Sequence, residues 1–336
     1  MHRTRQRLTL LLVGLLLLTS CVTPPPMTPQ TDVPEPPGRL IDVNGHRMHR
    51  YCTGEGGPTV LLEAGLGDFS LYFWLVQEEL SATTRVCSYD RAGLGSSEPT
   101  AGPRTGKQMA TQLEALLQAA GEHGPYVLAG HSMGGLVALL FAGEHLAETA
   151  GVVLIDSSHP AQEEQLADSL PGVSNALDQA SRARWEEWAA RAAAGTLTVS
   201  DLWPLSPASL PARVTEQIAA LLVRPHPWRA VIAEDDGWQQ TLREAKGAGA
   251  LGNVPLVVIA AGRGLESQMP AEDRQRFGLE FGDLKRFDKI WRGLQRDHLT
   301  RSSHSRLVVA NNSTHYIYLD EPEVVIKAIQ SLLKHD

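Results

Sequence analysis

The sequence predicts an α/β fold built on a mostly parallel β-sheet, and three observations carry this prediction. A hairpin pattern comes first, at residues 39–52. Short apolar strands then alternate with amphipathic helices, which is the order typical of a parallel sheet. One long stretch, residues 159–252, contains no convincing strand and interrupts this alternation. The chain has 336 residues, which is enough for one large domain with a sizeable core.

The predicted strands are short apolar runs that end at turn residues. Asn44-Gly45 joins the first two strands as a hairpin. Continuous apolar runs such as residues 151–155 are typical of strands that are buried on both faces of a sheet. The sequence predicts eight strands, at residues 39–44, 47–52, 59–63, 84–89, 126–129, 151–155, 254–260 and 306–310.

Helices are predicted between these strands, at residues 105–120, 136–145 and 323–333. For the last of them, Asp320 is the expected cap and Pro322 is expected in the first turn. Residues 159–252 are rich in Ala, Glu, Arg and Trp and are predicted to be a helical insertion that covers the strand ends as a cap. Its tryptophans are expected mainly in the packing of this cap, with some at a substrate cleft: Trp185, Trp188, Trp203, Trp228 and Trp238.

The first 38 residues are predicted to lie outside the fold. Arginines within the first seven positions precede an apolar run at residues 8–18, and this arrangement is typical of a secretory signal over residues 1–20. The signal ends in Leu18-Thr19-Ser20-Cys21, which resembles the lipobox of bacterial lipoproteins. The resemblance implies a lipid on Cys21 and an exported, membrane-anchored protein that faces the periplasm or the cell surface. Residues 21–38 contain seven prolines and are expected to be an extended tether.

Composition and charge exclude one class of partner. The net charge is −8, and no run of basic residues follows the first seven positions. Because phosphate binding needs clustered Lys and Arg side chains, a nucleic-acid partner is not expected. After the amino-terminal signal, no segment is long and apolar enough to span a bilayer.

The segment Gly130-His131-Ser132-Met133-Gly134 fits the glycine–x–serine–x–glycine pattern of a nucleophile elbow. In such an elbow, the serine lies on a tight turn between a strand and a helix, and its neighbours must be small. The helix that follows directs its amino terminus at the reacting atoms, where it favours developing negative charge. The predicted strand before this segment and the predicted helix after it are the context that the pattern requires.

From residue 40 to the carboxyl terminus, the chain resembles the α/β-hydrolase family. The resemblance rests on the elbow, on Ala64-Gly65-Leu66-Gly67, on residues 90–96 and on Ser313-Thr314-His315-Tyr316. It implies an α/β-hydrolase fold: an eight-stranded, mostly parallel sheet flanked by helices, with a helical cap between the sixth and seventh strands. The core would comprise residues 39–158 and 253–336, and the cap would comprise residues 159–252.

The resemblance also implies roles for individual residues. Ser132 would be the nucleophile and His315 the general base and acid, while the backbone N–H groups of Leu66 and Met133 would bind the oxyanion. Ala64 stands where many relatives have histidine. Because only backbone donors are needed there, this departure leaves the expected role of the loop unchanged.

The acid of the triad remains open at this stage. In the family it follows either the sixth or the seventh strand. Asp156 stands directly after residues 151–155 and is favoured, and Glu266 is the alternative after the seventh strand. Three other carboxylates are further candidates: Asp283, Asp288 and Asp297.

The fold implied by the resemblance also places two cysteines on adjacent strands. In this fold the second strand lies beside the fourth and runs antiparallel to it. Cys52 ends the second predicted strand and Cys87 lies in the fourth, so the two are expected to form a disulfide, which export would permit.

The expected function is therefore a serine hydrolase that cleaves carboxylic esters through an acyl-enzyme intermediate, without a metal or a cofactor. Its expected partners are a small-molecule ester and, through Cys21, a membrane. A thioesterase, lactonase, amidase or carbon–carbon bond hydrolase would use the same residues. A non-catalytic surface lipoprotein that uses the fold for binding is the third hypothesis.

Overall fold

A computed structural model of the protein describes residues 35–102, 104–202, 209–269, 271–276 and 278–333. The predicted signal, Cys21, most of the tether and Trp203 therefore lie outside the described residues. The end of the predicted tether contacts the rest of the protein. The carbonyl oxygen of Glu35 accepts a hydrogen bond of 3.1 Å from the side chain of Gln217, and that of Pro37 lies 2.9 Å from Nε2 of His49.

The centre of the fold is an eight-stranded sheet with the order β1-β2-β4-β3-β5-β6-β7-β8. Strand β2 is antiparallel to both of its neighbours, and all pairs from β4 onward are parallel. This order confirms the predicted sheet. The strands are β1 (Arg39–Val43), β2 (His46–Thr53), β3 (Thr59–Glu63), β4 (Val86–Tyr89), β5 (Tyr126–His131), β6 (Thr149–Ile155), β7 (Leu256–Ala261) and β8 (Ser305–Ala310).

Two of the differences from the predicted strands have local causes. Strand β4 begins at Val86 rather than at residue 84, because the N–H of Thr84 bonds to Leu80 and closes the turn after α1. Strand β5 continues two residues beyond the prediction, to His131. The register pairs Gly130 with Leu154 and His131 with Ile155, so the sheet extends up to the serine itself.

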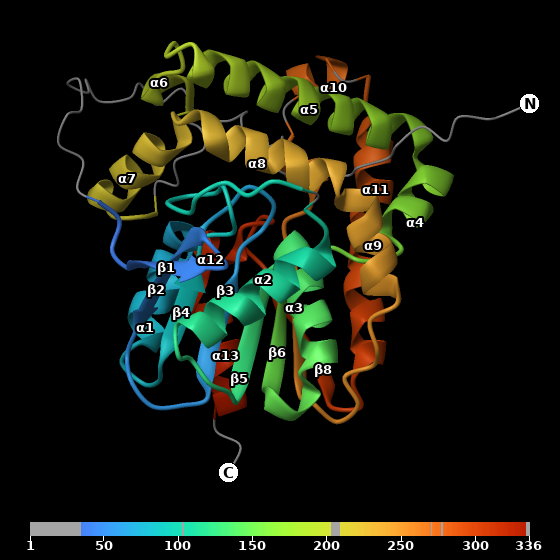
Figure 1. Ribbon diagram of the computed structural model, residues 1–336. Coiled ribbons are helices and arrows are strands. Elements are labelled where there is room, and N and C mark those ends of the chain that lie inside the picture. The colour runs from blue at the N-terminus through green and yellow to red at the C-terminus, as the bar shows by residue number, and fades with distance from the viewer. Residues whose placement is uncertain (1–34, 103, 203–208, 270, 277, 334–336) are drawn as a thin grey trace, which may run out of the picture.

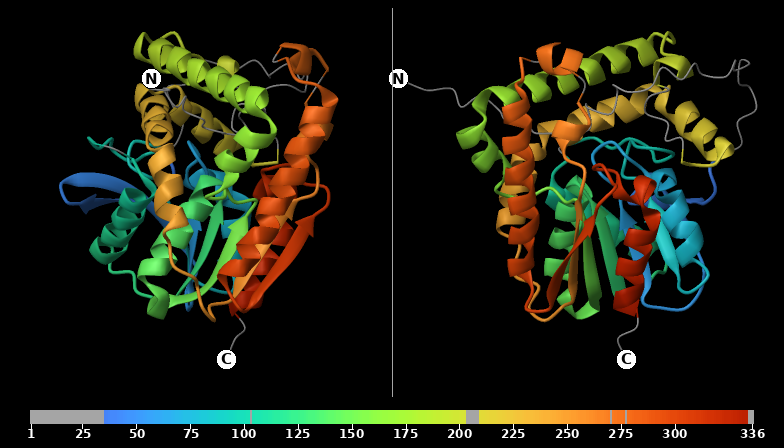
Figure 2. Two further views of the ribbon diagram at one scale, coloured as in Figure 1. Left: turned by 90° about the vertical axis from the view of Figure 1, so that its right-hand side faces the viewer. Right: turned by 180° about the vertical axis from the view of Figure 1, so that it is seen from behind.

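Helices cover both faces of this sheet. Helices α2 and α3 lie on one face, and α1, α12 and α13 lie on the other (Figures 1 and 2). Thr105 caps α2 through a capping box with Gln108, and the helix buries an apolar stripe that includes Met109, Leu113 and Leu116. These helices are α1 (Trp74–Leu80), α2 (Gly106–Ala119), α3 (Met133–Glu144), α12 (Ile317–Asp320) and α13 (Pro322–Leu333).

Two predicted helix starts differ in detail. Helix α3 begins directly after the serine, three residues before the predicted start. Pro322 does lie in the first turn of α13, but the predicted cap by Asp320 is wrong. The Asp320 carboxylate instead accepts hydrogen bonds from the N–H and the hydroxyl of Thr314, at 2.7 and 2.6 Å.

The chain between β6 and β7 is helical where it is described. Helices α5 to α8 lie above the sheet in Figure 1. Helix α9 descends beside α3 and packs against both α2 and α3. The tryptophans Trp185, Trp188, Trp228 and Trp238 are all buried, so they serve packing. The helices are α4 (Gln162–Ser169), α5 (Pro171–Ala193), α6 (Val199–Leu202), α7 (Ala212–Leu222), α8 (Pro225–Asp236) and α9 (Trp238–Lys246).

A further helical segment lies between β7 and β8, where no helix is predicted. It contains α10 (Ala271–Arg276) and the long α11 (Phe281–Asp297), which packs against α4 (Figure 1). The contact is a small separate core of Leu166, Leu170, Leu265, Met269, Leu279, Leu284, Phe287, Trp291 and Leu294. The spacing of Leu284, Phe287, Trp291 and Leu294 is that of an amphipathic helix, so the sequence contains a signal for α11.

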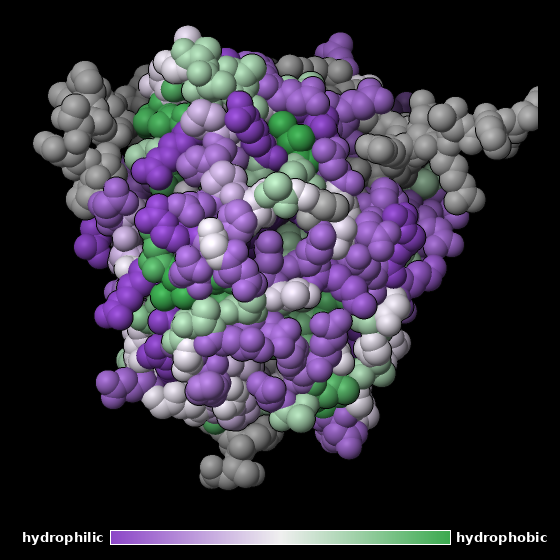
Figure 3. Space-filling model, in the orientation of Figure 1, coloured by the Kyte–Doolittle hydropathy of each residue, from purple (hydrophilic) through white to green (hydrophobic). Residues whose placement is uncertain are grey.

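The disulfide between Cys52 and Cys87 is present, as the fold resemblance implies. The two residues are directly paired across β2 and β4. The face in Figure 3 is mostly hydrophilic, with apolar residues in small separate groups. Over the part of the chain that is described, no helix has both the length and the apolar character that a bilayer crossing needs.

Candidate active site

Ser132 lies at the turn between β5 and α3 and is 5% exposed. Its backbone has φ +51° and ψ −122°, a conformation that residues other than glycine rarely adopt. The space around this turn requires glycine. A Cβ on Gly130 would lie 2.5 Å from the carbonyl oxygen of Gly134, and a Cβ on Gly134 would lie 2.4 Å from that of Ala64. The turn therefore presents the serine at the carboxyl edge of the sheet.

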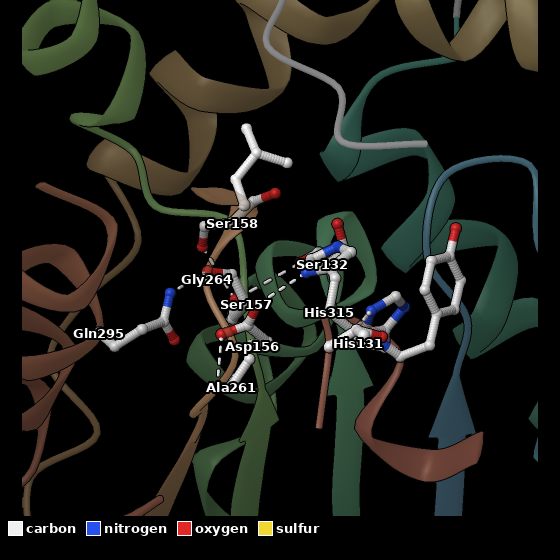
Figure 4. Close-up of polar contacts among 12 residues, drawn as sticks. His131, Ser132, Asp156, Ser157, Ser158, Ala261, Gly264, Gln295 and His315 are labelled. Atoms are coloured by element: carbon white, nitrogen blue, oxygen red, sulfur yellow. Dashed lines mark hydrogen bonds and ion pairs between the residues drawn. The ribbon is translucent and has the colours of Figure 1, made fainter. Parts of the chain in front are cut away.

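Asp156 and His315 form a buried hydrogen-bonded pair at the same edge (Figure 4). Asp156 follows β6 directly, and His315 lies in the loop between β8 and α12. Nδ1 of His315 lies 2.7 Å from Oδ2 of Asp156, and the other carboxylate oxygen accepts a 3.0 Å hydrogen bond from the N–H of Ala261. Because both oxygens are engaged, the carboxylate fixes the orientation of the imidazole ring.

The second nitrogen of His315 remains available for chemistry. Among the described residues, Nε2 of His315 has no hydrogen-bond partner although it is buried, and Ser132 does not supply one. Hydrogen bonds between a catalytic base and its nucleophile often tighten only when substrate is bound. Nδ1 donates to a carboxylate, so Nε2 is the nitrogen left to accept a proton.

The two predicted oxyanion donors lie on neighbouring loops. Leu66 follows β3, and Met133 is the first residue of α3. Both are fully buried. Within the described part of the chain, neither backbone N–H donates a hydrogen bond to another protein group. Unpaired amide donors at a helix start and in an adjacent loop are the arrangement that an oxyanion requires.

The other candidate acids have different partners. Asp288 accepts hydrogen bonds from the N–H groups of Leu265 and Glu266, at 2.8 and 3.1 Å, and caps the turn after β7. Asp283 belongs to the capping box of α11, and Asp297 bonds to His159 at 3.0 Å. Among the described residues, none of these carboxylates bonds to His315, and neither does Glu266. The geometry therefore favours Asp156.

A pocket lies beside the Asp156–His315 pair. Its lining includes Arg263, Leu265, Phe287 and Trp291. Trp291 meets His315 edge to face, with ring centroids 6.0 Å apart. The described tryptophans of residues 159–252 do not line this pocket. Two of its aromatic residues, Phe287 and Trp291, come from α11, which the sequence analysis did not predict.

His131 is buried beneath this site and its protonation is suppressed. Its Nε2 lies 3.0 Å from the carbonyl oxygen of His315, so it donates to that carbonyl. Burial, and then the neighbouring His315, lower the pKa of His131 well below its ordinary value. Nearby, burial raises the pKa of Asp68 to about 6, although a hydrogen bond of 2.9 Å from the Tyr318 hydroxyl opposes this.

A second group of buried charges lies at the site, formed by Arg91, Glu234 and Arg104. Sequence reasoning missed Glu234 and Arg104. Arg91 could be found as part of the glycine-rich segment after β4, but Glu234 lies on α8 and has no motif around it. Within the described residues, one group has the spacing of a metal site, namely Cys52, Cys87 and Glu122. Its two sulfurs form the disulfide and are not thiolate ligands.

Residues 60–328 of the chain match the Alpha/beta hydrolase family. This match covers most of the sequence, including Ser132, Asp156 and His315. The chain therefore belongs to the α/β-hydrolase family, and the sheet order described above agrees with that membership.

Two curated proteins illustrate how the similarity is distributed. The uncharacterized protein YqjL of Bacillus subtilis is 27% identical over 285 residues, which are 84% of this chain and 86% of that protein. "Probable transporter efuK" of Hormonema carpetanum is 37% identical over 127 residues, but these are 35% of this chain and only 18% of that protein.

Solved structures show the same fold at low identity. A thermophilic esterase from Thermogutta terrifontis is 22% identical, with a TM-score of 0.56, and the alignment covers 88% of this chain and 97% of that one. The enol-lactonase from Burkholderia xenovorans is 20% identical, with a TM-score of 0.58, and the alignment covers 88% of this chain and all of the other. At such identities the likeness shows the fold and leaves the reaction open.

Proposed function

We propose that this protein is a serine hydrolase that cleaves carboxylic esters with Ser132, His315 and Asp156. The observation that carries the proposal is the buried hydrogen bond between Asp156 and His315, beside a serine in a strained elbow. The three residues follow the carboxyl ends of three parallel strands, β5, β6 and β8, which supports the proposal. The unpaired amides of Leu66 and Met133 add the groups that an acyl-transfer reaction needs.

In the proposed mechanism, Oγ of Ser132 attacks the acyl carbon while Nε2 of His315 takes its proton. Asp156 keeps the proton of the imidazole on Nδ1 and stabilises the imidazolium that forms. The N–H groups of Leu66 and Met133 bind the oxyanion, and each such donor contributes about 3 kcal/mol in comparable sites. His315 then gives its proton to the leaving alcohol, and water releases the acyl group by the same steps in reverse.

Labelling with a fluorophosphonate probe tests whether the protein is a serine hydrolase at all. We expect the native protein to be labelled and the Ser132→Ala variant to remain unlabelled, because the probe reacts only with an activated serine. Equal labelling of both proteins would place the reactive group elsewhere. Absence of labelling in the native protein would favour the non-catalytic binding hypothesis.

The scissile bond needs a separate measurement, because esters, thioesters, amides and lactones undergo the same acyl transfer. A substrate panel with one acyl group and different leaving groups compares these bonds directly. We expect kcat/KM to be highest for the p-nitrophenyl ester and its alkyl ester counterpart. A p-nitrophenyl series of rising chain length then measures the depth of the acyl pocket.

We further propose that Cys21 carries a lipid that anchors the enzyme to a membrane outside the cytoplasm. The support is the lipobox-like sequence at the end of the apolar run and the proline-rich segment that follows it. A protein with several acyl chains on one cysteine binds membranes firmly. Expression of the full chain with Cys21→Ser should release a soluble or unprocessed form. A processed variant that still partitions with the membrane would contradict lipidation.

A further inference from the structure

We propose that Arg91 and Glu234 are positioning residues that hold the Leu66 amide in place to bind the oxyanion. This inference rests on the proposed function. It assigns to α8, a helix of the segment between β6 and β7, a part in setting the geometry of the catalytic centre. The loop concerned is residues 64–67, which we call the oxyanion loop.

Arg91 is bonded directly to the backbone of the oxyanion loop. Its guanidinium is 2% exposed. Nη1 donates to the carbonyl oxygen of Ala64 and Nη2 to that of Gly65, both at 2.6 Å. A planar cation with several fixed donors can hold two successive carbonyl groups in one orientation.

The bond to Gly65 acts on the oxyanion donor itself. The carbonyl of Gly65 and the N–H of Leu66 belong to one peptide unit, which is planar and trans. Fixing the oxygen therefore fixes the N–H, which lies in the same plane and points in the opposite direction. A cation at the oxygen also polarises the peptide unit and makes the N–H a stronger donor. Orientation and donor strength are thus both set by Arg91.

Glu234 holds Arg91 from the opposite side. Its carboxylate, which is fully buried on α8, accepts from Nε and Nη2 of Arg91 at 2.8 and 3.0 Å. Burial alone would raise the pKa of Glu234, but Arg91 and Arg104 lower it below its ordinary value. The pair is therefore an ionised, bidentate one. The same carboxylate lies 3.4 Å from the N–H of Gly67, at the end of the oxyanion loop.

Other neighbours leave the guanidinium little freedom. Glu63, the last residue of β3, accepts from Nη1 of Arg91 at 2.9 Å and also bonds to the Tyr89 hydroxyl. Arg104 also donates to Glu234, at 3.1 Å. It thereby helps to keep that carboxylate ionised.

Another bidentate arginine–glutamate pair provides a matched control. Nε and Nη2 of Arg85 donate to Glu122 at 2.8 and 2.6 Å, directly before β4 and at the opposite edge of the sheet.

The test compares Arg91→Lys, Glu234→Gln and Arg85→Lys in the full chain with a p-nitrophenyl ester. We expect kcat to fall about 10- to 100-fold for Arg91→Lys and Glu234→Gln with KM changed less than about 3-fold, because a misplaced oxyanion donor weakens only the transition state. Arg85→Lys should retain kcat within about 3-fold. Affinity for a trifluoromethyl ketone, which forms an oxyanion, should fall in parallel with kcat.

Hydrogen exchange of the peptide that contains residues 64–68 separates this inference from the proposed function. Exchange should be faster in Arg91→Lys and Glu234→Gln than in the native protein, and unchanged in Arg85→Lys, whether or not the protein hydrolyses esters. Unchanged exchange and unchanged kcat in folded Arg91→Lys or Glu234→Gln would overturn the inference. An equal loss in Arg85→Lys would also overturn it, since the effect would then belong to arginine–glutamate pairs in general. If Arg91→Lys fails to fold, the nearly isosteric Glu234→Gln decides.

Discussion

Asp156 has a backbone φ of +40°, which is unusual for a residue other than glycine, and it uses both of its carboxylate oxygens. One oxygen orients His315 and the other is held by the N–H of Ala261 at the end of β7. A residue strained in its backbone and engaged at both oxygens is positioned by the fold. Asp288, by contrast, accepts hydrogen bonds from two backbone N–H groups of the turn after β7.

The two carboxylates therefore differ in their expected effect on turnover. Asp156→Asn should lower kcat by about 10⁴-fold, because an amide at this position favours the wrong imidazole tautomer. Asp288→Asn should leave kcat close to the native value. Steady-state kinetics with a p-nitrophenyl ester, on variants that retain the native circular dichroism, measures both. A large loss of kcat in Asp288→Asn, together with a normal kcat in Asp156→Asn, would assign the role of triad acid to Asp288.

Asp68 provides a prediction for pH. Burial raises its pKa from 3.8 to about 6, so the folded protein binds a proton that the unfolded chain has already lost. The stabilisation that this proton brings is present below about pH 4 and is lost as the pH rises through about 6. Relative to Asp68→Asn, the native protein should therefore lose about 2 kcal/mol of unfolding free energy between pH 4 and pH 7. Urea unfolding of both proteins across this pH range measures the two unfolding free energies. A difference between them that stays constant with pH would contradict the prediction.

At this scale, the sequence indicates the local parts of the site and misses the distant ones. Ser132, Leu66 and Met133 lie in short glycine-rich motifs, and Asp156 ends an apolar run. Arg91 and Glu234 are 143 residues apart, and their contact depends on how α8 crosses the oxyanion loop. No local pattern encodes that crossing, so the sequence alone could not reveal the pair.

At the scale of elements, the sheet was predictable because its strands are short apolar runs that stop at glycine-rich turns. Strand β3 has the predicted limits, and β1 and β8 differ from prediction by one residue. Helix α11 was missed although its apolar spacing is visible in the sequence. As a result, the sequence analysis also missed Phe287 and Trp291, which α11 carries beside the proposed triad.

The small core between α4 and α11 gives a prediction for this element. Leu284 is fully buried there, so Leu284→Ala should lower the free energy of unfolding by about 2–5 kcal/mol. Leu146, which is 42% exposed, is the control. Leu146→Ala should change the free energy of unfolding by less than about 0.5 kcal/mol. Chemical denaturation measures both. Similar values for the two variants would mean that α11 contributes little to the cooperative fold.

At the scale of the whole molecule, the order of the strands places the disulfide away from the proposed catalytic residues. The disulfide joins β2 to β4 at one side of the sheet, while Ser132 follows β5. Two strands, β4 and β3, lie between β2 and β5, which corresponds to a distance of about 14 Å at the usual spacing of strands. The link therefore bears on the stability of the fold and leaves the proposed triad untouched.

Removal of the disulfide should thus reduce stability without reducing turnover. Cys52 and Cys87 are 35 residues apart, and closing a loop of that length lowers the entropy of the unfolded chain enough to stabilise the fold by about 4 kcal/mol. The Cys52→Ala, Cys87→Ala double variant should lose about this much in urea unfolding, and its kcat at 25 °C should match the native value. Dithiothreitol should lower the stability of the native protein to a similar degree and leave the double variant unaffected. A variant of native stability would show that the unfolded chain is already compact between β2 and β4, since the constraint would then remove little entropy.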